Sequence, residues 1–257
     1  MLTVRLIPAL ALVAALNSAA LAQTNKDKEL IQSARAAYYN LTRHNFNGFS
    51  ATIEPDWKVI LADTATAENL KVFRRQRLSM SVSGSGAVTL NQEFDEAPNA
   101  SLAPSVKQIH KNVQRLLSSF FGTWSFFMIG SPFPEIETRI ENLEKEQRLS
   151  YTVLTTEVRL KMTSEFLITE GLLTDPKSKR TIKPIFQKTT DGLVLTGYHT
   201  VFEPIGPGNR TTMNTVIEYA DIGGMKLPAR IHIKGMYGAE PVEAEFKFKD
   251  ADLTKPH

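Results

Sequence analysis

The spacing of apolar residues changes twice in the first half of the chain. Between residues 24 and 44 apolar side chains recur at three- and four-residue intervals, as on one face of a helix: Leu30, Ala34, Ala37, Tyr38 and Leu41. Alternation then begins at Phe49 and resumes after Pro55 at Trp57, Val59 and Leu61. The pattern predicts a helix over residues 28–44 and then strand, with Trp57 on the sheet.

A hairpin is predicted next, followed by a second helix. Leu78, Met80 and Val82 alternate up to the Ser-Gly-Ser-Gly turn at residues 83–86. From Pro104 to Phe120 apolar residues return to helical spacing, and Gly122 interrupts it. We therefore expect antiparallel strands and then a helix over residues 104–121, with another short amphipathic turn around residues 136–143.

The second half of the chain alternates almost throughout. Val158, Leu160 and Met162 are separated by charged residues, which is typical of a strand with one face in water. Pairs of turn-forming residues divide the segments at 175–176, 191–192 and 223–224. No linker or repeat divides the chain, so we expect one domain over residues 23–257, built on a meandering antiparallel sheet.

The first 22 residues have the features of a secretory signal peptide. Arg5 precedes an apolar stretch from Leu6 to Leu16, and Ala20-Leu21-Ala22 forms a small-x-small cleavage pattern. We predict cleavage between Ala22 and Gln23 and a periplasmic or secreted protein. The apolar stretch is short for a spanning helix, so we expect no stable membrane span in the mature chain.

Composition and charge exclude several classes of function. The chain has no cysteine, which excludes thiol nucleophiles, zinc–cysteine sites and iron–sulfur clusters. Removal of Arg5 with the signal leaves 29 basic and 27 acidic residues, a net charge of +2, without long runs of one sign. The densest basic patch, Arg74-Arg75-Gln76-Arg77, is interpreted as a solvated strand entry, and nucleic-acid binding is not expected.

No motif in the chain carries a recognisable chemistry. The sequence lacks a nucleophile elbow, a zinc-protease helix, a phosphate-binding loop and a dinucleotide fingerprint. Its five histidines are not at metal-ligand spacing, and its carboxylate pairs fit solvated faces. We predict no catalytic residue, no metal and no cofactor, and hence no enzyme.

The most informative segment is Leu116–Pro134, which carries no charge over 19 residues and contains five phenylalanines and one tryptophan. Three interpretations stay open. The segment is ordinary core, the wall or lid of an apolar ligand cavity, or a segment that contacts a membrane.

The order of elements resembles the LolA/LolB-like superfamily of periplasmic lipoprotein-sorting carriers. A local phrase, Gly223-Gly224-Met225-Lys226-Leu227-Pro228 between two strands, is similar to the late hairpin of such sequences. The resemblance covers nearly the whole mature chain. It implies an α+β fold in which a strongly curved antiparallel sheet, a half-barrel, has an N-terminal helix, and mid-chain helices cover its concave face.

From this resemblance we expect a non-enzymatic periplasmic carrier or binder of lipid, lipoprotein acyl chains or another hydrophobic ligand. The residues expected to contact the ligand are a lid and Trp57 on the facing sheet, the lid being Phe120, Phe121, Trp124, Phe126 and Phe127. Two alternatives remain: a secreted enzyme without a recognisable motif, and a structural envelope protein that binds a protein partner.

Overall fold

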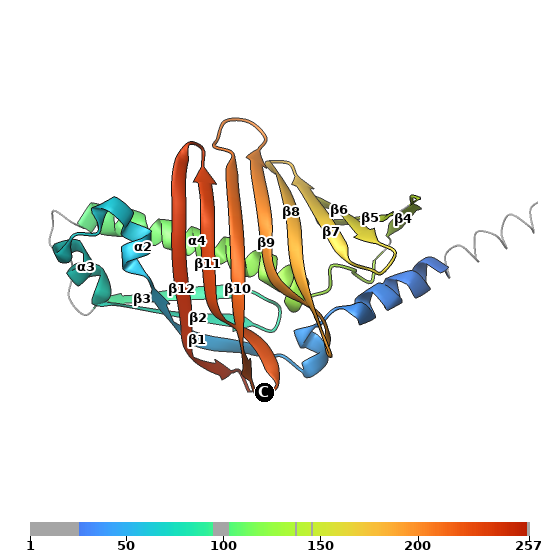
Figure 1. Ribbon diagram of the computed structural model, residues 1–257, viewed down its shortest axis with the longest axis horizontal. Helices are drawn as coiled ribbons and strands as arrows, with labels where there is room; N and C mark the ends of the chain where they lie inside the picture. Colours follow the sequence, from blue (N-terminus) through green and yellow to red (C-terminus); the bar gives the residue numbers. More distant parts are fainter. Residues whose placement is uncertain (1–25, 95–102, 137, 145, 256–257) are drawn as a thin grey trace, which may run out of the picture.

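A computed structural model describes residues 26–94, 103–136, 138–144 and 146–255. Within these residues the strands form one open antiparallel sheet in the order β3-β2-β1-β12-β11-β10-β9-β8-β7-β6-β5-β4. In Figure 1 β1–β3 run across the view while β9–β12 run up it, so the sheet curves between them. The strands are β1 (Gly48–Pro55), β2 (Gln76–Ser83), β3 (Val88–Phe94), β4 (Arg139–Asn142), β5 (Glu146–Val153), β6 (Thr156–Thr163), β7 (Ile168–Asp175), β8 (Ser178–Thr189), β9 (Gly192–Pro204), β10 (Thr211–Ile222), β11 (Met225–Tyr237) and β12 (Glu240–Leu253).

Helices make up the remaining elements, and the fold class is therefore α+β, as predicted. Residues 26–37 form the N-terminal helix. The others are η1 (Leu41–His44), α2 (Trp57–Leu61), η2 (Ala62–Thr64), α3 (Ala67–Arg74) and α4 (Ala103–Met128). The predicted signal peptide lies outside the described residues.

Most of the alternating segments form strands where the sequence predicts them. In β12, Ala244, Phe246 and Phe248 are buried, and the charged residues between them face water. The turn at residues 83–86 joins β2 to β3, and the Gly86 amide donates to the Ser83 carbonyl. The sequence Arg74-Arg75-Gln76-Arg77 is indeed the entry to a strand, because β2 begins at Gln76.

The N-terminal helix is shorter than predicted. It ends at residue 37, because Tyr38 pairs with Leu193 in a bridge and the Tyr39 amide donates to the Leu193 carbonyl. A separate turn, η1, then starts at Leu41 and is capped by Asn40, whose side chain accepts a hydrogen bond from the Thr42 backbone amide. The predicted interval of 28–44 therefore holds two helical segments instead of one.

The prediction of a strand at Trp57 is wrong. β1 ends at Pro55, and the Asp56 carboxylate accepts hydrogen bonds from the amides of Lys58 and Val59, which caps the short helix α2. Trp57 and Leu61 lie four residues apart in α2 and are both buried. Three apolar residues at every second position therefore fit one helical turn as well as a strand.

α4 is longer than predicted, because Gly122 does not end it. The helix runs to Met128, and the amides of Ile129 and Gly130 both donate to the Ser125 carbonyl at its end. Gly122 is exposed and a Cβ there would meet no atom within 4 Å, so this residue lies outside the buried face of α4. The short amphipathic turn predicted around residues 136–143 is also wrong, since β4 lies there and pairs with β5.

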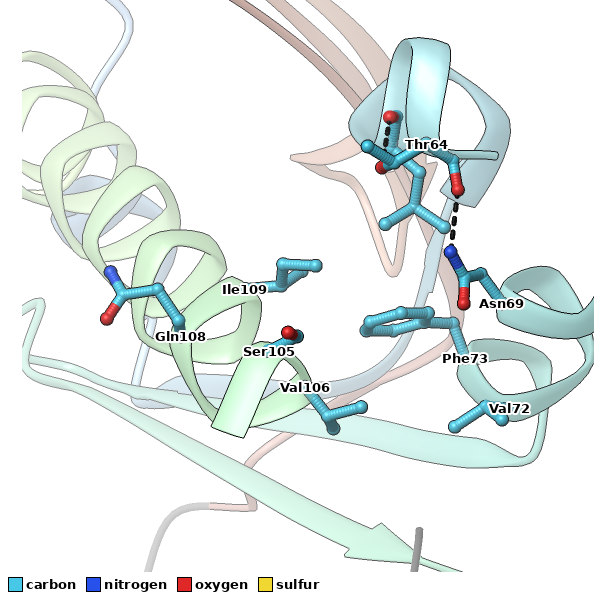
Figure 2. Close-up of a pocket in the computed structure, with 9 residues that line it drawn as sticks. Thr64, Asn69, Val72, Phe73, Ser105, Val106, Gln108 and Ile109 are labelled. Atoms are coloured by element: carbon cyan, nitrogen blue, oxygen red, sulfur yellow. Dashed lines mark hydrogen bonds between the residues drawn. The ribbon is translucent and has the colours of Figure 1, made fainter. Parts of the chain in front are cut away.

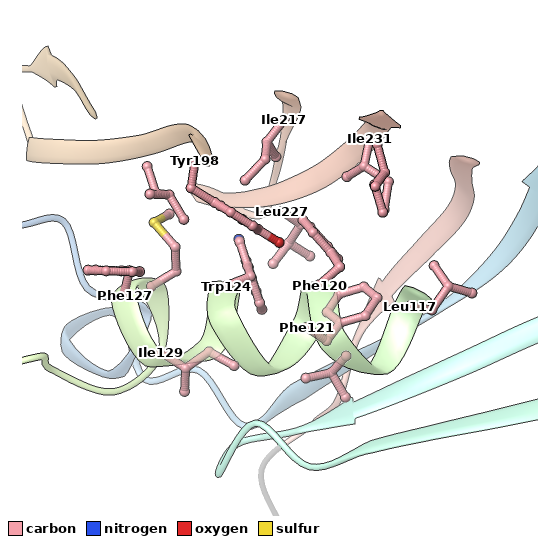
Figure 3. Packing of buried hydrophobic residues seen from close by; sticks show 14 of the residues in the cluster. Leu117, Phe120, Phe121, Trp124, Phe127, Ile129, Tyr198, Ile217, Leu227 and Ile231 are labelled. Carbon is pink, nitrogen blue, oxygen red and sulfur yellow. The ribbon is translucent and has the colours of Figure 1, made fainter. Parts of the chain in front are cut away.

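α4 contributes many of the buried side chains and contacts strands in both parts of the sheet, β1–β3 and β9–β12. The Trp124 indole donates a hydrogen bond of 3.2 Å to the Tyr219 hydroxyl on β10. The rings of Phe120 and Phe248 on β12 stack with centroids 6.5 Å apart. Near the other end of α4, His110 is hydrogen-bonded to Gln92 on β3. Figure 3 shows the α4 side chains pointing toward the strands.

Candidate functional site

A pocket of about 400 Å³ opens between η2–α3 and the first turns of α4. Its volume falls within the range of about 300–1,000 Å³ that is usual for small-molecule sites. Figure 2 shows Phe73 of α3 facing Val106 and Ile109 of α4. The lining residues are Leu61, Thr64, Asn69, Val72, Phe73, Ser105, Val106, Gln108 and Ile109.

A helix cap and the helical spacing of the lining residues explain how the two walls of this pocket form. Thr66 caps α3 by accepting a hydrogen bond from the Asn69 amide, so that Asn69, Val72 and Phe73 share one face of that helix. The opposite wall is a face of α4 that includes Val106 and Ile109, three residues apart. Two amphipathic helices from separate parts of the chain therefore meet across the space.

The polar groups of the lining are uncharged, and the chain itself uses several of their donors. The Thr64 hydroxyl donates to the Leu61 carbonyl at 2.6 Å. The side-chain nitrogen of Asn69 donates to the Thr64 carbonyl at 2.8 Å. The Gln108 amide nitrogen donates to the Asn112 side-chain oxygen at 3.1 Å. The described lining contains no titratable residue, so this pocket offers neither a general base nor a nucleophile with a partner.

A buried aromatic and polar layer lies behind the pocket. The ring of Phe73 packs against Trp57 with centroids 4.9 Å apart, and both rings lie edge-on to His110 at about 6 Å. His110 is only 6% exposed and bonds to the amides of Gln76 and Gln92. Burial lowers the pKa of His110 to about 4, so the imidazole is neutral near pH 7.

The structure separates the six residues predicted to contact a ligand from this pocket. Phe120, Phe121, Trp124 and Phe127 are at most 1% exposed and pack in the core, and Phe126 is half-buried beside them. Trp57 is the nearest, since it contacts the lining residue Phe73. None of the six is among the residues that line the pocket, and their contact with a ligand stays a prediction.

The sequence does not identify the residues that line the pocket, although it contains one signal for them. Val106 and Ile109 lie in the segment whose helical spacing predicts the helix over residues 104–121, and no helix is predicted where α3 lies. Thr66 followed by Asn69, Val72 and Phe73 has the spacing of a capped amphipathic helix. That signal predicts a helix but does not say which segment the helix faces.

Outside the pocket, titratable side chains gather mainly on the water-facing side of the sheet. His232 lies 2.8 Å from Glu243, which also pairs with Lys234, and Arg230 pairs with Glu245. His232 lies between the buried Ile231 and Ile233, as the alternation predicts. Across the described ranges, no group of three or more histidines and carboxylates could hold a metal ion.

Two further findings bear on function. In the part of the chain that the structure describes, no helix combines the length and the apolar character needed to cross a membrane. No protein-family model, curated protein or solved structure matches the chain.

Proposed function

We propose that the protein is a non-enzymatic binder of an apolar ligand, such as a lipid or an acyl chain, in the pocket between α3 and α4. The single observation that carries this proposal is the space of about 400 Å³ with five apolar and four uncharged polar lining residues. Such composition is typical of a site that binds by burial and orients its ligand with a few hydrogen bonds.

The burial of an acyl chain supplies enough free energy for binding with a Kd in the micromolar to millimolar range. Each methylene that leaves water contributes about 0.8 kcal/mol, so about ten contribute about 8 kcal/mol. Association offsets part of this by restricting the motion of the ligand. Even half of that gain, about 4 kcal/mol, corresponds to a Kd of about 1 mM, and the full gain to about 1 μM.

We also propose that α4 lies in the concavity of a half-barrel, as the resemblance to the LolA/LolB-like superfamily implies. Two sets of contacts support this arrangement. Trp124 and Phe120 of α4 contact β10 and β12, while His110 of the same helix contacts the edge strand β3, which lies three strands from β12 and five from β10 in the sheet. A helix that contacts strands this far apart in an open sheet fits inside a curved one.

In this arrangement the aromatic residues have two proposed roles. Trp57 supports the pocket through Phe73, and it reaches a ligand when the Phe73 ring moves. The buried side chains of Phe120, Phe121 and Trp124 form the end of the apolar interior and hold α4 against the sheet. Their contact with a ligand stays a prediction. An exported carrier in the periplasm or outside the cell, where the predicted signal peptide would direct it, is the role that we favour.

The test is saturable binding of an uncharged fluorescent probe, N-phenylnaphthylamine, to the purified protein. Replacing Ile109 with Trp fills the pocket, and we expect it to abolish binding. Ser118→Trp adds the same side chain at an exposed position of α4 outside the pocket, and should leave binding unchanged. Native mass spectrometry then identifies any lipid that co-purifies.

Two outcomes would contradict the proposal. One is the absence of saturable binding, and the other is equal binding by wild type and Ile109→Trp. Either result would favour the alternative of a partner-binding envelope protein. That alternative has some support in the apolar side chains of Ile205 and Tyr237, which are 53% and 47% exposed at the tips of neighbouring hairpins.

A further inference from the structure

The polar side of the pocket presents hydrogen-bond acceptors. The Thr64 hydroxyl uses its one proton on the Leu61 carbonyl, which leaves its oxygen lone pairs for another donor. The Asn69 side chain donates through its nitrogen to the Thr64 carbonyl, and Figure 2 shows its oxygen pointing away from that bond, toward Phe73. Two acceptor oxygens, from η2 and α3, therefore lie beside the apolar space.

The size of the pocket limits the ligand to one chain. At about 30 Å³ for a group of the size of water, a space of about 400 Å³ encloses on the order of a dozen non-hydrogen atoms, and the rest of a larger ligand lies at the open mouth of the pocket. A single medium-length chain with a small polar head matches this volume, whereas a lipid with two long chains would leave much of its apolar surface in water.

We infer that the ligand is a single-chain amphiphile whose uncharged head donates a hydrogen bond, such as a long-chain alcohol or a monoacylglycerol. This inference rests on the proposed function and narrows it. A hydroxyl head donates to the Thr64 or Asn69 oxygen and can also accept from Ser105, which brings a hydroxyl to the opposite wall. An ionised carboxylate only accepts, so it could take a hydrogen bond from Ser105 but would place its charge against the Thr64 and Asn69 oxygens without a bond to either.

Exposed basic residues on the same helices do not change this preference. Lys71 and Arg74 of α3 and Lys107 of α4 are exposed and do not belong to the lining. In helical geometry they lie on faces away from the lining residues of their own helix. Water and salt screen such charges, so they attract anions weakly and without a fixed geometry.

The experiment measures displacement of N-phenylnaphthylamine from the full purified protein by four ligands with the same alkyl chain length. Dodecanol and monododecanoylglycerol donate a hydrogen bond, methyl dodecanoate is uncharged and only accepts, and dodecanoate is ionised at about pH 8. We expect half-displacement by dodecanol at a concentration about fivefold lower than by methyl dodecanoate, which corresponds to one hydrogen bond. Dodecanoate should be weaker again.

Two variants test whether the Asn69 side-chain oxygen on α3 causes the preference for dodecanol over methyl dodecanoate. Asn69→Leu keeps the apolar space and removes the oxygen, so the advantage of dodecanol over methyl dodecanoate should fall to less than about twofold. Glu68→Leu places the same side chain at the neighbouring exposed position outside the lining, and should keep the wild-type ratio. The wild-type comparison is informative even if Asn69→Leu fails to fold.

The outcomes separate the two proposals. If the probe does not bind at all, the proposed function fails. If the probe binds but methyl dodecanoate or dodecanoate displaces it as well as dodecanol does, the function stands and the inference about the head group is wrong. Tight, salt-sensitive binding of dodecanoate would show that the exposed basic residues select an anionic head instead.

Discussion

Replacement of Trp124 by Ala tests whether the aromatic segment is core or ligand wall. The indole is fully buried and packs against the rings of Phe49 and Phe121, with centroids 6.2 and 5.8 Å away. Its N–H donates to the Tyr219 hydroxyl at 3.2 Å, and that hydroxyl donates to the Leu195 carbonyl at 2.6 Å. Burial raises the pKa of Tyr219, so the hydroxyl keeps the proton that it donates.

The expected loss in the free energy of unfolding is about 4 kcal/mol. Truncation of a large buried aromatic residue costs about 3–5 kcal/mol through lost transfer free energy and the cavity that remains. Loss of the indole hydrogen bond contributes about 1 kcal/mol of this, and not more, because Tyr219 still has its bond to Leu195. A domain is stable by about 5–15 kcal/mol in total, so the variant should still fold but with a much lower denaturation midpoint.

Equilibrium urea unfolding followed by far-ultraviolet circular dichroism measures this loss, because the signal does not depend on the tryptophan that is removed. The slope with urea should match the wild type if both proteins unfold from equally compact states. A loss below about 1 kcal/mol at an unchanged slope would refute the reasoning. It would mean that Trp124 borders space that is already empty or exchangeable, which is what the ligand-wall interpretation requires.

The other predictions concern backbone geometry and protonation. Gly122→Ala should raise the free energy of unfolding by about 1 kcal/mol in the same assay, because the site is helical, exposed and open. Gly192→Ala should lower it by about 2 kcal/mol or more, since φ is +116° and a Cβ would lie 2.8 Å from the Tyr39 nitrogen. The pKa of His110 falls from 6.5 in the unfolded chain to about 4 in the folded one. Its neutral form therefore contributes fully to the free energy of unfolding above pH 6.5, and this contribution decreases as the pH falls to about 4. This loss should total about 3 kcal/mol and be absent in His110→Asn, measured as urea midpoints across that range; equal pH profiles would contradict it.

The strands of the second half could be predicted because each has one buried and one wet face. In β11 and β12, the buried Ile231 and Phe246 lie opposite each other in the strand register. The next residues, Arg230 and Lys247, also lie opposite each other, on the other face of the sheet. A two-residue period is a local property, so the sequence alone displays it. The pairing of β1 with β12, by contrast, joins segments almost a chain length apart, and no local pattern specifies it.

The failures have equally specific causes. Trp57, Val59 and Leu61 alternate, but Asp56 caps a helix there, and the burial of Trp57 and Leu61 against the rest of the protein stabilises it. Gly122 has a poor helix propensity of about 1 kcal/mol relative to Ala, and the burial of the neighbouring Phe121 and Trp124 outweighs it. Tertiary packing decided both positions, and a window of a few residues does not contain that information.

The pocket could not be predicted because it exists only where α3 and α4 face each other. Each helix shows its own apolar face in the sequence, yet Phe73 and Ile109 meet only after the sheet has brought their elements together. The expectation of an apolar ligand came from the aromatic segment instead. The structure places that segment mainly in the core and places an open space one helix turn beyond His110.

The two ends of α4 are held differently, and on the proposed function this difference predicts where a ligand enters. At the C-terminal end, Trp124 bonds to Tyr219, the Thr42 hydroxyl donates to the Ile129 carbonyl, and the Asn40 amide donates to the Gly130 carbonyl. At the N-terminal end, a neutral His110 bonded to two amides stands next to the apolar space. Buried polar bonds resist separation, because each group that loses its partner in the interior costs about 1–3 kcal/mol. On the proposed function we therefore expect the aromatic end of α4, with its three bonds, to stay in place. We expect a ligand to enter at the opposite end, where the bonds of His110 hold the helix beside the pocket.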